Sequence, residues 1–280
     1  MTAADVAAVI DIDRYPLADP ALVARVRAEL ASTGCCALPD FVRPDLRGTL
    51  RREGVELAPG AYYDVETVNV YNTDPDPRLP DGHPARIPME RGNAFVARDL
   101  VPRDALIHRL YEDQAFQRFV AACFGLDAVY ELADPLSGLT LNVVVPGRSH
   151  PWHFDTNEFT VSMLTQASED GGVFEFCPGI RSAGSENLED VRAVLDGRGG
   201  HLVRRLTPRP GDLQLFLGRY SLHRVSTVAG SRARHSAIFA YSERPGVIGS
   251  PARTRQLFGR VTPAHLAVEG RTVRVDELMD

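Results

Sequence analysis

The chain has 280 residues, 44% of them hydrophobic, which suffices for one large domain or two smaller ones. Its formal net charge of −6 at pH 7 argues against a nucleic-acid partner, since binding phosphates requires a basic face. The N-terminus lacks the pattern of a signal peptide, and no stretch approaches the roughly 18 apolar residues of a membrane span. We therefore expect a cytoplasmic protein that binds neither nucleic acid nor membranes.

Residues 1–135 are expected to form a helical and mixed N-terminal part. Asp19 and Pro20 offer an N-cap followed by proline at the first helical position, and Gly34 can end that helix. Residues 73–91 hold five prolines and many charges, and such a long loop in a compact domain is usually a lid or a binding loop. In chain order we expect a helix over residues 21–32, a strand over 35–38, a helix over 44–54, a strand over 62–71, the loop over 73–91 and a helix over 105–124.

Residues 136–246 are expected to form a core built of strands. Helices followed by many antiparallel strands favour a double-stranded β-helix, the cupin-like jelly-roll, which is mainly β with a helical buttress. A tight turn is expected at 169–172. We expect a single domain over 1–280, ending in a polar tail over 247–280. The strands are expected over 139–145, 158–166, 173–176, 202–206, 212–217 and 234–242, with one helix over 186–195.

A His-x-Asp motif at His153 and Asp155, followed by His223 68 residues after the aspartate, predicts a metal site. The motif can hold one metal ion from a local turn, and a distant histidine completes a 2-His-1-carboxylate triad. Such a triad is typical of non-haem iron oxygenases and leaves coordination positions open for a keto acid and dioxygen. A His-x-Asp pair alone is a weak signal because it occurs by chance, so the prediction depends on the residues that accompany it.

Arg234 and Ser236 are predicted to bind the far carboxylate of 2-oxoglutarate. The planar guanidinium group of arginine binds carboxylates in a bidentate manner and keeps its proton. Residues two apart on a strand share a face, so Ser236 can add its hydroxyl group, whereas His235 faces the other side. Arg234 follows His223 by 11 residues, so we expect the two on neighbouring strands joined by a turn at 228–231.

Three segments carry a resemblance to a known family. They are HPWHFDTNEFT over residues 150–160, GDLQLF over 211–216 and GRYSLHRV over 218–225. In these segments the chain resembles the Fe(II)/2-oxoglutarate-dependent dioxygenases, and among them the branch of the free-amino-acid radical halogenases and their hydroxylase relatives. The likeness covers roughly residues 139–246, and the N-terminal half matches only in outline.

The reaction that this resemblance implies depends on Asp155. By the resemblance, His153, Asp155 and His223 are the Fe(II) ligands, while Arg234 and Ser236 bind 2-oxoglutarate. The halogenases of this branch have glycine or alanine in place of the carboxylate ligand, which leaves a position for chloride. Because Asp155 is present, halogenation is disfavoured.

The implied reaction is the abstraction of hydrogen from an unactivated C–H bond, driven by oxidative decarboxylation of 2-oxoglutarate with dioxygen. The expected substrate is a small amino acid or an amino-acid-derived natural-product intermediate, and the expected outcome is hydroxylation. Oxidative cyclisation, for example cyclopropane formation on a modified amino acid, and desaturation are alternatives with the same cofactors. A more distant alternative is a non-catalytic cupin that binds a metal ion, whose site would not need Arg234. A homodimer is compatible with the sequence.

Five further residues are candidates for the binding of substrate or cosubstrate. His150 either contacts an amino-acid carboxylate or only orients the loop through a hydrogen bond. Arg86 and Arg91, at the end of the proline-rich loop, either clamp a carboxylate over the site or are solvated at the surface. Asn142 lies in an apolar strand, so its amide needs a partner, which is the cosubstrate, the substrate or a neighbouring backbone group. Trp152, the only tryptophan, is either a binding platform or, as is commoner, part of the core.

The remaining histidines and the cysteines indicate no second metal site. Four histidines lack a partner at ligand spacing and are expected to face solvent or to be hydrogen-bonded in the core. They are His83, His108, His201 and His265. The cysteines include an adjacent pair, which would rarely form a disulfide, and none shows zinc-finger spacing. We expect buried, reduced thiols at Cys35, Cys36, Cys123 and Cys177.

Overall fold

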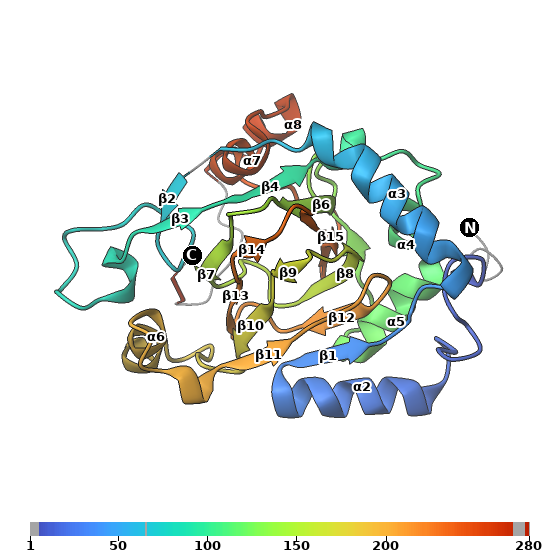
Figure 1. The fold of residues 1–280 in the computed structure, drawn as a ribbon, viewed down its shortest axis with the longest axis horizontal. Helices are drawn as coiled ribbons and strands as arrows, with labels where there is room; N and C mark the ends of the chain where they lie inside the picture. Colours follow the sequence, from blue (N-terminus) through green and yellow to red (C-terminus); the bar gives the residue numbers. More distant parts are fainter. Residues whose placement is uncertain (1–5, 65, 271–277, 280) are drawn as a thin grey trace.

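Two antiparallel sheets form the centre of the molecule, as a computed structural model that describes residues 6–64, 66–270 and 278–279 shows (Figure 1). The larger sheet has the order β1 (Cys35–Leu38), β12 (Leu213–Phe216), β8 (Thr160–Gln166), β15 (Arg234–Phe239), β6 (Leu139–Val144) and β4 (Asn93–Val96). The smaller sheet has the order β11 (Arg204–Leu206), β10 (Phe174–Cys177), β13 (Leu222–Val225) and β7 (His150–His153). This arrangement is the double-stranded β-helix that the sequence predicts.

Three short strand pairs form separate two-stranded sheets beside the two larger ones. They are β14 (Val228–Ala229) with β9 (Asp170–Gly171), β16 (Tyr241–Ser242) with β5 (Tyr130–Glu131), and β2 (Glu66–Val68) with β3 (Met89–Arg91). The pair β2–β3 lies at the end of the molecule where β7 ends the smaller sheet (Figure 1). It thereby brings Arg91, the last residue of β3, to the side of the smaller sheet.

Helices from the N-terminal part form a buttress along the larger sheet. Helix α2 packs against α5 and β1, and α3 packs against β8 (Figure 1). The main hydrophobic core lies between these helices and the sheet, and it includes Leu22, Val26, Phe116, Leu139 and Leu213. The helices are α2 (Pro20–Thr33), α3 (Arg47–Leu57), α4 (Leu106–Glu112), α5 (Gln114–Phe124), α6 (Leu188–Leu195), α7 (Pro251–Phe258) and α8 (Pro263–Leu266). Short 3₁₀ turns accompany them at Pro44–Leu46, Ala58–Gly60, Pro84–Arg86, Arg98–Leu100 and Gly200–Leu202.

Helix α2 shows how the local sequence sets the boundaries of an element. The side chain of Asp19 accepts a hydrogen bond from the Ala21 amide at 2.9 Å, and Pro20 occupies the first turn, where no amide hydrogen is needed. Gly34 ends the helix in the left-handed conformation, with φ of 69°. The predicted helix is therefore confirmed to within one residue at each end.

Several predicted elements are wrong in extent. The expected helix over 105–124 is broken at Asp113, whose carboxylate accepts hydrogen bonds from the amides of Ala115 and Phe116 and so begins a new helix. The expected strand over 62–71 is reduced to β2, and the loop over 73–91 contains β3. The polar tail over 247–280, in which no helix was expected, contains α7 and α8.

The connection between His223 and Arg234 also differs from the prediction. The two residues were expected on neighbouring strands, but His223 lies in β13 of the smaller sheet and Arg234 in β15 of the larger one. The intervening segment crosses from one sheet to the other and forms β14 on the way. Both side chains can then approach the same interior from opposite walls, which a simple hairpin would not allow.

The thiols and the remaining histidines lie as expected. All four cysteines are free and buried. His108 lies within hydrogen-bonding distance of the Val101 carbonyl and the Glu112 carboxylate, and His265 lies 3.0 Å from the carboxylate of Asp134 in a fully buried pair. Among the described residues, no helix is both long enough and apolar enough to span a membrane.

Candidate metal and cosubstrate site

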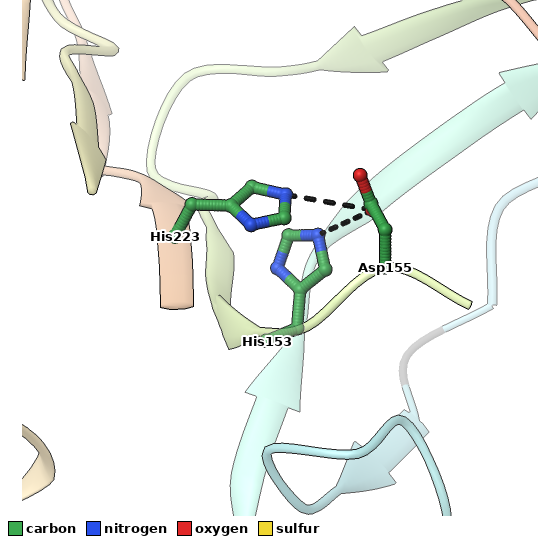
Figure 2. A group of neighbouring side chains, drawn as sticks. All are labelled: His153, Asp155 and His223. Carbon is green, nitrogen blue, oxygen red and sulfur yellow. Dashed lines mark ion pairs between the residues drawn. The ribbon is translucent and has the colours of Figure 1, made fainter. Parts of the chain in front are cut away.

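Three potential metal ligands converge where β7 and β13 pair. His153, the last residue of β7, lies directly opposite His223 of β13, and Asp155 follows β7 by two residues. One ligand atom from each of the three lies within 4.8 Å of the other two. Figure 2 shows both imidazoles pointing toward the carboxylate, with Oδ1 of Asp155 3.7 Å from Nε2 of His153 and 3.5 Å from Nε2 of His223. The structure thus brings together the three residues that the sequence selects.

Backbone carbonyl groups fix the orientation of both imidazoles. Nδ1 of His153 lies 2.8 Å from the Pro151 carbonyl, and Nδ1 of His223 lies 2.9 Å from the Ser221 carbonyl. A carbonyl only accepts, so each Nδ1 carries the hydrogen, and the lone pair is on the Nε2 that faces Asp155. Burial and the neighbouring His223 lower the pKa of His153, which keeps its ring neutral. Two imidazole nitrogens and a carboxylate form the donor set that is typical of non-haem Fe(II) oxygenases.

The carboxylate of Asp155 is held from two sides. The Thr160 hydroxyl donates to Oδ2 at 2.6 Å, which leaves Oδ1 facing the histidines. Gly218 lies so close that an added Cβ would overlap Oδ2. Burial raises the pKa of Asp155, but the neighbouring rings of His223 and His153, together with the hydrogen bond from Thr160, outweigh burial and hold this pKa below its usual value. The group is therefore an anion at neutral pH.

Aromatic rings surround His223 on the inner face of the smaller sheet. Its ring centroid lies 4.8 Å from that of Phe216 and 5.7 Å from that of Phe174. Phe216 belongs to β12 of the larger sheet, so its contact with His223 bridges the two sheets. Such an apolar wall limits the access of water to the triad.

Arg234 has the properties of a binding site for a carboxylate. Its side chain is buried, and within the described chain we find it bonded only to Ser236, whose hydroxyl oxygen lies 2.6 Å from its NH1. Burial lowers the pKa of Arg234 to about 10. A buried guanidinium without a carboxylate partner is costly, so an anionic ligand fits here. Gly172 leaves room for the arginine side chain itself, since a Cβ there would lie 3.1 Å from Cδ of Arg234.

Asn142 lies beside this arginine pair. It is opposite Ser236 in the pairing of β6 with β15, and its Oδ1 accepts a hydrogen bond from Asn93 Nδ2 at 3.2 Å. The carbonyl oxygen of Asn142 therefore has a side-chain partner, which was not among the expected alternatives, and the contact of its amide group with the cosubstrate or substrate stays a prediction. His235 faces the other way, as expected, toward Gly54 of α3.

Two of the predicted substrate residues, His150 and Arg91, lie on the side of the triad, whereas Arg86 does not. His150 stacks on His153 with ring centroids 3.8 Å apart, and Arg91 is almost fully buried, at 2% exposure, and bonded to Glu66. Arg86 instead pairs with the exposed Asp81 at 2.7 Å and donates to the Leu79 carbonyl, both within its own loop.

Trp152 lies away from the triad, in the hydrophobic core. It alternates with His153 along β7 and so faces the opposite side of the strand. There it packs in a second core cluster with Phe154 and Cys177, beneath the guanidinium of Arg224. This position matches the alternative of a core residue.

Sequence reasoning missed three residues near the triad. Thr160 and Gly218 lie within segments that the resemblance includes, but nothing in the spacing relates them to Asp155. The third is Arg253 of α7, which is connected through Gln256 and Asn72 to the backbone between His153 and Asp155. The signal for α7 was present, since Ser250 and Pro251 repeat the N-cap and proline pattern that predicts α2.

Comparisons with known proteins agree with this geometry. The sequence model of the family described as Halogenase D matches residues 18–247. No curated protein sequence matches the chain. Several solved structures are similar in fold.

One is an oxidoreductase of the 2OG-Fe(II) oxygenase family from Burkholderia pseudomallei, with 17% identity and a TM-score of 0.52 over 80% of this chain and 92% of that one. Another is a prolyl hydroxylase from Trichoplax adhaerens in complex with a peptide of hypoxia inducible factor, with 15% identity and a TM-score of 0.53 over 80% of this chain and 90% of that one. A third is SnoK, a non-haem α-ketoglutarate-dependent carbocyclase from nogalamycin biosynthesis, with 15% identity and a TM-score of 0.51 over 80% of this chain and 87% of that one.

Proposed function

Because the chain belongs to the halogenase D family of Fe(II)/2-oxoglutarate-dependent oxygenases, we propose that it oxidises an unactivated C–H bond of a small amino acid or an amino-acid-derived intermediate. The proposed outcome is hydroxylation rather than halogenation. The observation that carries this choice is the carboxylate of Asp155 between the two histidines. A carboxylate ligand fills the coordination position that a halide would otherwise take.

In this proposal His153, Asp155 and His223 hold Fe(II). Arg234 and Ser236 hold the far carboxylate of 2-oxoglutarate. When bound, iron with 2-oxoglutarate and dioxygen supplies an oxidant that can take hydrogen from an unactivated C–H bond.

The protein's own contribution is orientation and the exclusion of water. Thr160 keeps Oδ2 of Asp155 turned away from the histidines, and the carbonyls of Pro151 and Ser221 keep both Nε2 atoms turned inward. The phenyl rings of Phe174 and Phe216 close the wall beside His223. The fixed groups position a substrate so that one C–H bond is favoured over its neighbours.

Ring closure and desaturation remain alternatives with the same cofactors. The fold does not choose among them, since a prolyl hydroxylase and a carbocyclase are both similar to this chain. The mass of the product distinguishes hydroxylation from these outcomes. Hydroxylation adds one oxygen atom, whereas desaturation and cyclisation each remove two hydrogen atoms.

A cupin that only binds a metal ion is the competing function of another class. Arg234 argues against it, because a metal site alone gives no reason to bury an arginine without a carboxylate partner.

The test is succinate formation from 2-oxoglutarate with Fe(II), ascorbate and a panel of free amino acids. We expect slow succinate formation by the iron-loaded protein alone and a marked increase with at least one amino acid. His223→Ala should lose both the slow succinate formation and its increase with an amino acid. His201→Ala, a change at an exposed histidine, should keep both rates. Absence of succinate with the wild-type protein would refute the oxygenase proposal in favour of the metal-binding one.

A further inference from the structure

Two arginines from peripheral elements meet on the side of the triad where His150 lies. Arg91 of β3 donates to the Glu66 carboxylate at 2.8 Å and to the Gln256 carbonyl at 3.0 Å, while its buried Nε has no partner. Arg253 of α7 is half-buried and donates to the side chain of the same Gln256. Gln256 therefore joins the two guanidinium groups, one through its backbone and one through its side chain.

This pair shares its surroundings with the triad. Nε2 of Gln256 donates to the Asn72 carbonyl at 3.5 Å, and Nδ2 of Asn72 donates at 3.1 Å to the carbonyl of Phe154, the residue between the first two proposed metal ligands. Burial lowers the pKa of Arg253 to about 10. The positive charge of Arg91 lowers this pKa further, whereas the negative charges of Asp155 and Glu66 oppose the shift. Gln256 thus connects Arg253 to the backbone of the metal-binding motif, and β3 packs Arg91 against β7, which begins at His150.

The charges on this side do not balance. In the proposed enzyme the charges of Fe(II), Asp155, 2-oxoglutarate and Arg234 cancel. Arg91 is neutralised by Glu66. Within the described residues we find no carboxylate paired with Arg253, so one positive charge remains beside the triad. Removing a charge from water without a counter-ion is unfavourable, and a ligand with one negative group would correct this.

We propose that Arg253, together with Arg91, binds the carboxylate of the substrate. Arg253 is then a specificity-determining residue of this enzyme. The proposal rests on the proposed function and narrows its substrate class to molecules with a free carboxylate. Amides, esters and carrier-bound thioesters lack that charge and are excluded by it. Arg253 lies beyond residues 18–247, the part of the chain that the family model matches. The subsite therefore uses a residue that the shared core does not supply.

The experiment compares free L-amino acids with their carboxamides on four proteins: wild type, Arg253→Gln, Arg253→Lys and Arg255→Gln. Arg255 is an exposed arginine of the same helix and serves as the matched control. The readouts are succinate formation without amino acid, the KM for the stimulating amino acid, and the KM for 2-oxoglutarate. Thermal unfolding of each variant reports whether it is folded.

We expect wild type to be stimulated by an acid and not by its amide. Arg253→Gln should raise the KM for the acid about tenfold or more, because a charged partner of the carboxylate is lost. Arg253→Lys should recover part of this loss by restoring the charge, and Arg255→Gln should resemble wild type.

Three results would overturn the inference. They are equal stimulation of wild type by acid and amide, no stimulation by any acid in the panel, or an unchanged KM for the acid in a folded Arg253→Gln. Succinate formed without amino acid tests the proposed function separately, so failure of the oxygenase proposal is recognised by its absence.

Discussion

The two ends of the candidate active site are built differently, although each presents an arginine. Arg234 belongs to a central strand of the larger sheet, is buried, and bonds to Ser236 on the same strand. Arg253 belongs to a short helix outside the sheets, is half-buried, and is joined to Arg91 through Gln256. A cosubstrate common to a family suits a rigid core strand, whereas a substrate that differs between relatives suits peripheral elements that can change without disturbing the core.

Asp155→Gly should reduce oxidation activity most, because it removes a proposed metal ligand that lies between the cosubstrate end and the substrate end of the site. We expect loss of more than about 100-fold in oxidation, since even the partners of metal ligands are worth roughly 10–100-fold. We also expect little or no chlorination, because an open position for chloride does not place the substrate for halogen transfer. Mass spectrometry of the products formed with abundant chloride is the measurement.

A dominant chlorinated product would show that the pocket is already arranged for halogenation. Oxidation at the wild-type level would show that Asp155 is not a ligand.

Arg234→Ala tests the cosubstrate end. We expect the KM for 2-oxoglutarate to rise roughly 100-fold or more, because truncation of one partner in a buried charge pair costs about 3–5 kcal/mol. Iron binding should stay nearly intact, since no ligand is removed. The control is Arg232→Gln, which changes an arginine bonded to the Ala167 carbonyl just before β15. An unchanged affinity for 2-oxoglutarate would show that Arg234 does not bind the cosubstrate.

Gly218→Ala tests how the carboxylate is held. The new methyl group would collide with Oδ2 of Asp155, which must then leave its hydrogen bond with Thr160. We expect the affinity for Co(II), followed by its visible absorption, to fall by about 10–100-fold. Gly184→Ala is the control, because a Cβ there meets no atom within 4 Å. Equal affinities in the two variants would mean that Gly218 does not position the ligand.

His150→Ala, at the proposed substrate end of the site, should reduce activity least among these variants. We expect amino-acid-stimulated turnover to fall about tenfold, and the slow decarboxylation of 2-oxoglutarate without substrate to fall less. Both rates are read from succinate. If both fell equally, His150 would serve only to orient His153, on which it stacks.

The sequence predicts the part of the site that depends on short-range spacing. His153 with Asp155, and Arg234 with Ser236, are pairs two residues apart, so a strand or a turn is enough to bring each pair together. The distant His223 was found because it completes a ligand set of known chemistry. The sequence did not place it correctly relative to Arg234, because a change of sheet leaves no periodic signal.

The substrate end was largely hidden for the same physical reason. Arg253 approaches Arg91 only because α7 packs on β4, a contact between segments more than 150 residues apart in the sequence. A polar composition made the tail resemble solvated chain, although Ser250 and Pro251 begin a helix there. Strands β7 and β13 were missed because their residues were interpreted as a metal-binding turn and its distant ligand rather than as strands.

The central claim is that Arg234 and Arg253 serve two different carboxylates. The most direct test measures the KM for 2-oxoglutarate and the KM for the stimulating amino acid in both Arg234→Gln and Arg253→Gln. We predict a crossed result, in which the first change raises mainly the KM for 2-oxoglutarate and the second mainly that for the amino acid. If either change raised both constants by the same factor, the two arginines would not bind separate carboxylates and the claim would be contradicted.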